Sequence, residues 1–560
     1  MIEVHGDSVV IQTKTLYAIF QKGLITTLRS IAGESFIEIS DGEVDKVASL
    51  ELLYASGPHA ELGRGPRGQI ECRSLSDTCA EIRFSGWHAD GVITLTEDEA
   101  TGDLIVDPAA FSARPGVCAC RWNVSGVLND LELVAPFFQG VKLSLGDSLL
   151  QNTHWSWPHE WEAGLLILQG RTGGFWIHTE DTQYRYKSVQ LGKNGAGAIG
   201  LESWAYGPVD NNLSAGGLSW KINVYTGDWQ VPAATYRQWW WEAYGLQKVA
   251  ETRAPWTKDV SMAISWCPND VRILEALAKN VPPEKVLIHF PYWRTDAYDQ
   301  HYPNYVATDA AIDFIQRGQE YGFHIAPHFN ALEIDPSHHL FDLVRDFQYR
   351  HISTKEILGW GWDGVAIPVP SSNHQLTRNR SLNVMAKIHP GLKMWQSILM
   401  ENMAKPVQQL KLDTVFLDVA LATFNLHNCL VDNMTPTEGL HVELQQISKL
   451  SNGLVLAGEG LNEITAQTLS FAQVHLFRSY HDTISGLEGI GCPLNHFLFS
   501  KLTRSFGYSR LGGHTEEEKL RMRAHEAQGA IPTITIHSAD ELDEPNVEIQ
   551  QMLKSVQEQH

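Results

Sequence analysis

The hydrophobic pattern of this 560-residue chain changes period part-way along, and that change limits the possible folds more than any other feature. Up to about residue 227, short apolar runs with period two, such as Ser8–Gln12 and Val92–Leu95, are separated by Gly and Asp turns. After Val260, β-like apolar runs alternate with amphipathic helical segments. A chain that switches pattern in this way is expected to contain an all-β domain followed by an α/β domain.

The N-terminal pattern is typical of an antiparallel β-sandwich, and the number of runs predicts two large sheets. We assign residues 1–231 to this domain. Ala233 to Leu246 has helical composition and Pro255 breaks the pattern, so residues 232–256 are expected to form a linker helix. The Trp239–Trp241 run in this helix is expected to be buried between the two domains.

Residues 257–560 are expected to form a (β/α)₈ TIM barrel, because near-continuous apolar strands that alternate with helices are typical of buried parallel strands. Seven strands can be placed, the first at 260–266 and the last at 531–536. The eighth is expected between Asn495 and Ser500 or in the 380s. The predicted fold class is therefore α/β with an all-β domain, a β-sandwich followed by a barrel.

Charge and composition exclude several classes of partner. The formal net charge of −22 disfavours nucleic acid and anionic membrane surfaces. No apolar stretch reaches about 18 residues, and the N-terminus lacks the pattern of a secretory signal. The seven cysteines form neither a zinc-ribbon pattern nor an even disulfide framework, which fits a reducing compartment. We therefore expect a cytoplasmic protein with no nucleic-acid or membrane partner, and nothing in the composition indicates an oligomeric state.

The chain contains 18 Trp and 24 His, several of them in loops between apolar runs. Aromatic rings with polar neighbours suit sugars, whose C–H faces stack on indole while their hydroxyls need hydrogen bonds. A large β-rich protein also buries many aromatic side chains, so composition alone leaves both interpretations open. The partner that we expect is an oligosaccharide or glycoside substrate.

Two carboxylates stand where the active site of a barrel is expected, at the C-terminal ends of strands. Asp418 ends the apolar run Val415–Leu417, and Glu459 ends the next strand between two glycines, which are expected to let a ligand approach closely. A carboxylate in an apolar run is costly unless it is hydrogen-bonded or catalytic. The structural alternatives are a loop-capping Asp and a solvated turn Glu, and Glu463 is the rival of Glu459.

The two carboxylates are more informative as a pair. Adjacent strands lie about 4.8 Å apart, so the pair can reach the separation of about 5 to 5.5 Å that a retaining glycosidase needs. Asp418 is expected to stay ionised and to attack the anomeric carbon. Glu459, beside that charge, is expected to have a raised pKa and to protonate the leaving oxygen.

Other polar or aromatic residues stand at strand ends or in Gly-rich loops, and we expect them to bind the sugar, with a structural role as the alternative. They are Trp266, Trp293, His328, Asn330, Trp360, Trp362, His389, Arg478, His481 and Asp482.

Other chemistries are less well supported by the motifs. A metal-dependent hydrolase is one alternative, because His324, His328, Asp335, His338 and His339 fall in one segment, although their spacing matches no HExxH helix. Phosphate-binding loops and GxSxG nucleophile elbows are absent from the sequence. We predict no cofactor and no metal ligand at the site.

The order of sandwich, linker helix and barrel, with Leu412–Val419 followed one strand later by Ala457–Gly460, resembles the endo-α-N-acetylgalactosaminidase family of glycoside hydrolases. It also resembles their exo-acting relatives and the broader α-galactosidase and α-glucosidase group. The resemblance implies hydrolysis of α-linked sugars with retention, with Asp418 as nucleophile after the fourth strand and Glu459 as acid/base after the fifth.

The sequence departs from the pattern of that family at two places. Val419-Ala420-Leu421 stands where an aromatic residue usually follows the nucleophile, and Gly460 rather than Trp follows Glu459. The first hypothesis is a retaining glycosidase for α-galactosides or α-N-acetylgalactosaminides. The alternative from another class is a non-catalytic carbohydrate-binding protein built on a degenerate barrel.

Overall fold

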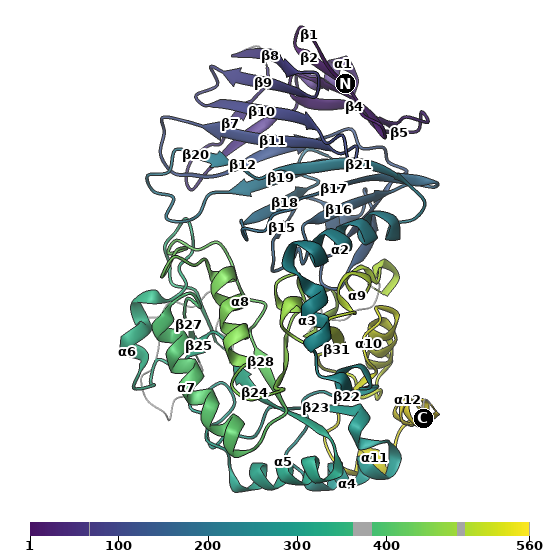
Figure 1. Cartoon of the computed structure of the whole chain (residues 1–560), viewed down its shortest axis with the longest axis vertical. Coiled ribbons are helices and arrows are strands. Elements are labelled where there is room, and N and C mark those ends of the chain that lie inside the picture. The colour runs from purple at the N-terminus through teal and green to yellow at the C-terminus, as the bar shows by residue number, and fades with distance from the viewer. Residues whose placement is uncertain (66–67, 196, 362–383, 479–487, 559–560) are drawn as a thin grey trace.

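The computed structural model describes residues 1–65, 68–195, 197–361, 384–478 and 488–558. The β-sheets of the N-terminal part lie above the barrel in Figure 1, and the helices α2 (Gln230–Tyr244) and α3 (Leu246–Thr252) descend between them. The expected order of all-β region and (β/α)₈ barrel is confirmed.

The N-terminal region is antiparallel throughout and contains three sheets rather than two. The first 38 residues form a five-stranded meander that the period-two pattern did not separate from the rest. Its strands are β1 (Ile2–His5), β2 (Ser8–Gln12), β3 (Leu16–Gln21), β4 (Leu24–Ser30) and β5 (Ser35–Glu38), and helix α1 (Asp41–Val44) follows.

The two large sheets bury their facing sides against each other around residues such as Trp122 and Trp220. The ten-stranded sheet contains β8 (Gln69–Ser76), β9 (Cys79–Ser85), β10 (Asp90–Glu97), β11 (Leu104–Phe111), β13 (Glu132–Ala135), β14 (Val141–Ser144), β16 (Leu165–Gln169), β17 (Gly173–His178), β20 (Ser214–Gly216) and β21 (Trp220–Thr226). The six-stranded sheet contains β6 (Leu50–Tyr54), β7 (Ala60–Leu62), β12 (Val117–Val124), β15 (Thr153–Ser156), β18 (Lys187–Leu191) and β19 (Ile199–Trp204).

The expected linker helix consists of α2 and α3, with a break at Gly245, whose φ of +62° favours glycine. Trp240 is buried and its indole donates to the carbonyl of Glu463 at 3.2 Å, whereas Trp239 and Trp241 are half-buried. Trp240 belongs to a cluster with apolar side chains from both the sandwich and the barrel, so α2 packs against both. The domain boundaries at residues 231 and 256 stay a prediction.

Eight parallel strands form the barrel, in the order β31-β30-β29-β28-β24-β23-β22-β32. A single isolated bridge, between Phe506 and Ile531, connects its two ends. The strands are β22 (Met262–Ile264), β23 (Val286–Phe290), β24 (His324–Asn330), β28 (Thr414–Asp418), β29 (Val455–Glu459), β30 (Phe471–Val474), β31 (Arg504–Gly507) and β32 (Thr533–Ile534).

Both expected positions of the eighth strand are wrong, because that strand is β31. Residues of the first position form helix α9 (Leu494–Phe499), since a short apolar run fits a buried helix as well as a strand. Residues of the second form β27 (Val384–Lys387), which pairs antiparallel with β25 (Glu333–Ile334) and β26 (Gly359–Gly361) in a small sheet beside the barrel.

Helices cover the outside of the barrel, and side-chain caps fix where several of them begin. Thr308 caps α5, and the pairs Thr435/Glu438 and Thr515/Glu518 form capping boxes at the starts of α8 and α10. Among the described residues, no helix is both long enough and apolar enough to span a membrane. The helices are α4 (Val271–Asn280), α5 (Asp309–Tyr321), α6 (Phe341–Val344), α7 (Lys393–Gln409), α8 (Pro436–Ile447), α10 (Glu516–Ala527), α11 (Asp540–Asp543) and α12 (Val547–Glu558).

Candidate active site

Asp418 and Glu459 meet at the C-terminal edge of the barrel. They are the last residues of the paired parallel strands β28 and β29, whose register ends with Leu417 opposite Gly458. Asp418 is buried, the side chain of Glu459 is 14% exposed, and a side-chain hydrogen bond between the two contributes to the pKa shift of each.

Glu459 is held by two donors besides Asp418. His475, directly after β30, lies with Nε2 2.8 Å from Oε1, and the backbone N–H of Val419 donates to Oε2 at 3.0 Å. Val419 has φ +61°, a left-handed conformation that is unusual for a β-branched residue. The chain therefore turns sharply after Asp418 in a way that points this N–H at Glu459.

Within the described residues, Asp418 has a histidine, rather than a Lys or Arg side chain, within ion-pair distance. Its Oδ2 lies 3.4 Å from Nε2 of His328, whose Nδ1 is 3.0 Å from Nε2 of His289. Burial lowers the pKa of His328 to about 3 and also holds the pKa of His289 well below its usual value, so both rings are neutral at pH 7. The aromatic ring of Phe416 stacks on that of His328 and lies tilted against that of His289.

The protonation of the pair is the reverse of what the sequence predicts. Burial, and then the charge of Glu459, raises the pKa of Asp418 well above its usual value. Burial alone would also raise the pKa of Glu459, but His475 and the Val419 N–H outweigh it and lower that pKa. Because the two carboxyl groups are coupled, the first proton that the pair takes up lies on the Asp418 side. The pattern around Glu459 could not show this, since His475 comes from another strand.

Two of the expected sugar-binding residues lie beside the pair. Trp266 is half-buried, and its ring is 6.2 Å from that of His328. Asn330 is opposite Asp418 in the β24–β28 register. Its amide donates to Glu333 at 2.9 Å, and Glu333 accepts from Lys387 at 2.7 Å, so Asn330 belongs to a polar network at this edge of the barrel.

Trp293 and His389 have interior contacts instead. Trp293 is fully buried, and its indole donates to the carbonyl of His328 at 2.8 Å. His389 is also buried, and its ring nitrogens lie 2.9 Å from the carbonyl oxygen of Cys429 and 3.0 Å from the backbone nitrogen of Gly391. The structure thus gives both side chains contacts with the backbone and no exposed face.

For the remaining predicted site residues, the structure describes the backbone alone or does not include the residue. The backbone of Trp360 pairs with Met385 in the small sheet, and Arg478 follows Phe477 shortly after β30, with only the backbone described in each case. Trp362, His481 and Asp482 lie outside the described residues.

Glu463 is anchored away from the pair. Its Oε1 accepts from the indole of Trp157 at 2.5 Å and its Oε2 from the hydroxyl of Tyr236 at 2.6 Å. Burial raises the pKa of this carboxyl, and the nearby Lys187 opposes that shift. Glu463 therefore connects the sandwich and the linker helix to the barrel, and its position does not favour it as the acid/base.

The His-rich segment does not gather at one point. His324, at the start of β24, hydrogen-bonds Asp413 at 2.6 Å and stacks on Trp256, whereas His328 faces Asp418. Four residues of extended strand separate the two by about 13 Å. This arrangement removes the structural basis for a metal-dependent hydrolase built on that segment.

The sequence analysis missed His475 and Tyr298. His475 immediately follows β30, which ends at Val474, so it also stands at the C-terminal end of a barrel strand. Tyr298 lies in the loop after β23, with its ring 5.3 Å from that of His328 and its hydroxyl in the electrostatic field of Asp418. In the sequence, Tyr298 stands neither at the end of an apolar run nor beside a glycine, so no pattern distinguishes it.

A cavity of 350 Å³ lies between the sandwich and the loops of the barrel. Neither Asp418 nor Glu459 lines it, but Lys387 does, and Lys387 is the end of the network that includes Asn330. The aromatic side chains that line the cavity are those of Trp157, Tyr186, Trp204, Tyr349 and Phe424.

The family comparison covers the linker and most of the barrel. The family model described as Domain of unknown function (DUF6259) matches residues 218–509, just over half of the chain. The chain belongs to this family. No curated protein matches the sequence of this DUF6259 protein.

Similar folds are found among solved glycoside hydrolases. The DUF6259 protein is similar to the α-N-acetylgalactosaminidase NagBb from Bifidobacterium bifidum, with a TM-score of 0.65 at 12% identity over 99% of this chain and 92% of that one. It is also similar to the GH36 α-galactosidase AgaB from Geobacillus stearothermophilus, with a TM-score of 0.50 at 8% identity over 100% and 86% of the two chains. The expected resemblance to these two groups is confirmed at the level of the fold.

Proposed function

We propose that this protein is a glycoside hydrolase that cleaves α-linked galactosides or α-N-acetylgalactosaminides with retention. The observation that carries the proposal is the buried, hydrogen-bonded pair of Asp418 and Glu459 at the ends of adjacent barrel strands. Environments that shift the pKa values of two neighbouring carboxyls in opposite directions are typical of acid/base sites. The fold shared with NagBb and AgaB supports the choice of sugar.

The contact between the carboxyls gives the first step of the mechanism. As a sugar enters the site, the shared proton passes along the hydrogen bond from Asp418 to Glu459. The sugar then separates the two carboxyl groups. Asp418 is then an ionised nucleophile and Glu459 a protonated acid, which is the state that double displacement requires. Substrate binding thus produces the ionised Asp418 and the protonated Glu459, which the free site does not have.

In the next step Asp418 attacks the anomeric carbon as the bond to the leaving oxygen breaks, and Glu459 gives its proton to that oxygen. The Val419 N–H and His475 stabilise the resulting Glu459 carboxylate. Glu459 then accepts a proton from water, which attacks the anomeric carbon and releases Asp418. Two inversions leave the α configuration unchanged, and neither step calls for a cofactor.

Substrate contacts are proposed for residues on both sides of the pair. The half-buried indole of Trp266 offers a face for the sugar ring, and the network of Asn330, Glu333 and Lys387 offers polar groups for its hydroxyls. The aromatic cavity beyond Lys387 has room for the part of the substrate on the other side of the scissile bond.

A screen of aryl α- and β-glycosides tests the proposal. We expect release of the aryl group from the α-galactoside or the α-N-acetylgalactosaminide, and a loss of at least about 10²-fold in the Asp418→Asn variant. Hydrolysis of β-glycosides only would contradict the assignment to α-linked sugars. Sugar binding in calorimetry without turnover of any glycoside would support the carbohydrate-binding protein instead.

A further inference from the structure

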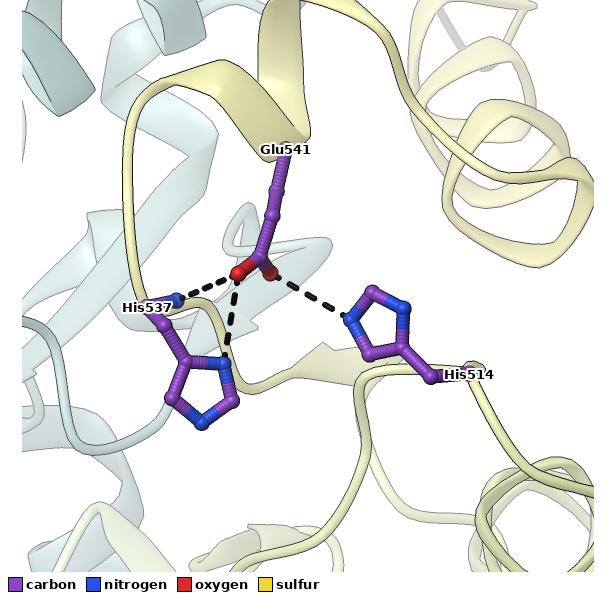
Figure 2. A group of neighbouring side chains, drawn as sticks. All are labelled: His514, His537 and Glu541. Carbon is purple, nitrogen blue, oxygen red and sulfur yellow. Dashed lines mark hydrogen bonds and ion pairs between the residues drawn. The ribbon is translucent and has the colours of Figure 1, made fainter.

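Two histidines and a glutamate converge on the outer part of the barrel, separate from the carboxyl pair. Figure 2 shows His514, in the loop between β31 and α10, and His537, after β32, both turned toward the carboxylate of Glu541 on α11. Their nitrogen and oxygen atoms all lie within 4.8 Å of one another. Over the described part of the chain, no other group of three His, Cys, Asp or Glu residues is close enough to hold a metal ion.

The distances in this cluster fit a metal better than direct hydrogen bonds. Nε2 of His514 is 3.5 Å from Oε2 of Glu541, and Nδ1 of His537 is 3.3 Å from Oε1. Charge-assisted N–H···O bonds are shorter, at about 2.7 to 2.9 Å. Two ligand atoms bound to tetrahedral zinc at about 2.1 Å lie about 3.4 Å apart. The 3.5 Å spacing between Nε2 of His514 and Oε2 of Glu541 is close to that edge length, whereas Nδ1 of His537 faces the other oxygen.

One oxygen of Glu541 lacks a hydrogen bond. Oε1 accepts from the backbone N–H of His537 at 3.2 Å, but Oε2 is buried and has no hydrogen-bond donor. An unsatisfied buried carboxylate oxygen costs about 1 to 3 kcal/mol or more. A cation between Glu541 and His514 would remove that cost.

The backbone places the ligands from both sides before any ion binds. The N–H of His514 donates to Glu518 of the α10 capping box at 2.7 Å, and Asn546 holds the carbonyl of Gly512 at 2.8 Å. The side chain of His537 is 78% exposed, so its ring is free to turn toward an ion. Closing the site therefore requires only the rotation of an exposed side chain.

The cluster spans the seam where the barrel closes. Apart from the Phe506–Ile531 bridge, the hydroxyls of Thr533 and Thr535 accept hydrogen bonds from the backbone of Gly507 and Leu511 across this seam. His514 follows the strand on one side, and the other two ligands follow the strand on the other side. An ion bound here would connect two strands that are joined by an isolated bridge rather than by a continuous ladder.

We propose that His514, His537 and Glu541 form a zinc site that stabilises the closure of the barrel, with water as the fourth ligand. Two imidazole nitrogens and a carboxylate oxygen are a donor set that zinc takes in proteins with one position left for water. The proposal differs from the sequence-based expectation of no metal, and it uses none of the residues between 324 and 339. It is independent of the proposed hydrolase activity.

The test uses the full, untagged chain after treatment with a chelator, titrated with zinc chloride by calorimetry and checked by elemental analysis. We expect one zinc ion per chain at the tightest site, and an affinity at least about tenfold lower in His514→Ala and Glu541→Gln. His5→Ala is the matched control, because His5 also pairs with a glutamate, Glu3, at 3.2 Å and is exposed, but has no third ligand. This control should bind zinc like the wild type.

Thermal melting gives a second measurement that does not depend on activity. Zinc at about 100 times its Kd should shift the folding equilibrium about 100-fold and raise the Tm of the wild type and of His5→Ala. The proposal is overturned if Glu541→Gln and His514→Ala keep the wild-type affinity, or if their Tm rises with zinc as much as that of the wild type.

Discussion

Glu459 and Glu463 are four residues apart in the same barrel, and their side chains have different partners. Glu459 faces Asp418 and His475, whereas Glu463 has both oxygens occupied by Trp157 and Tyr236. The pKa of the first is lowered and that of the second is raised. Burial and a shifted pKa therefore do not identify a catalytic carboxyl. In the mechanism that we propose, the partner distinguishes the two glutamates, because the second carboxyl group of Asp418 makes proton exchange possible and the donors Trp157 and Tyr236 hold Glu463 in place.

The largest expected effect is that of Asp418→Asn, which removes the nucleophile while nearly preserving its shape. We expect kcat on an unactivated glycoside to fall at least about 10³-fold. Retention of more than about a tenth of the activity would show that the nucleophile is another residue.

The same variant also tests the direction in which the fold shifts the pKa of Asp418. A carboxyl with a raised pKa in the fold contributes stability at low pH and loses it as the pH rises through the folded-state value. The Tm of the wild type should therefore fall relative to that of Asp418→Asn as the pH increases. Parallel Tm curves for the two proteins would contradict the assignment of the shared proton.

Glu459→Ala is expected to separate the two chemical steps. An aryl glycoside with a good leaving group needs little protonation, so a glycosyl adduct should accumulate on Asp418 while hydrolysis slows at least about 10²-fold. Azide should restore turnover and give an α-configured product, since it needs no general base. Mass spectrometry of the adduct and product analysis provide the measurement. Rescue in Glu463→Ala but not in Glu459→Ala would exchange the roles of the two glutamates.

Glu463→Ala should affect stability rather than chemistry. The change leaves the Trp157 indole and the Tyr236 hydroxyl without an acceptor, so the free energy of unfolding should fall by about 2 to 5 kcal/mol. Urea denaturation measures this loss, and Glu463→Gln, which keeps an acceptor oxygen, should lose less. The kcat of the folded fraction should stay within a few-fold of the wild-type value. A large fall in kcat at full folding would place Glu463 in the catalytic machinery.

His475→Ala tests the partner that distinguishes Glu459. His475 lowers the pKa of Glu459, so its removal should raise that pKa and move the optimum of kcat/KM to higher pH. We expect a shift of about one pH unit, which corresponds to about 1.4 kcal/mol. An unchanged pH optimum would mean that His475 has only a packing role, and Tm curves for the variant check that the fold is intact.

The sequence predicts the fold best where apolar runs are long and clearly bounded. Strand β28 ends at the expected residue, because the charged side chain of Asp418 ends its apolar run. Strand β31 was missed, since Arg504-Ser505-Phe506-Gly507 contains a single large apolar side chain and so has no readable period. Contacts across the barrel, rather than the local pattern, determine that this segment is a strand.

Within the candidate site, Asp418 and Glu459 could be located from the expectation that functional residues stand at the C-terminal ends of barrel strands. That expectation did not predict the direction in which the neighbouring side chains point. Trp293 turns into the core, and the position of the shared proton depends on His475, 16 residues beyond Glu459. Gly460, directly after Glu459, has a structural role beside the expected one of letting a ligand approach. Gly460 has φ +80°, and a Cβ there would lie 2.5 Å from Cβ of Leu421, so it allows the loop after β28 to pack closely.

The left-handed backbone at Val419 would shape how this protein responds to laboratory evolution. A non-glycine residue in this region costs about 1 to 3 kcal/mol, and here the cost keeps an N–H directed at Glu459. Glycine would adopt the same conformation at lower cost but would hold that N–H less firmly. Selection for heat resistance should therefore enrich glycine at residue 419, whereas selection for turnover should reject it, and sequencing both pools would compare the two outcomes directly.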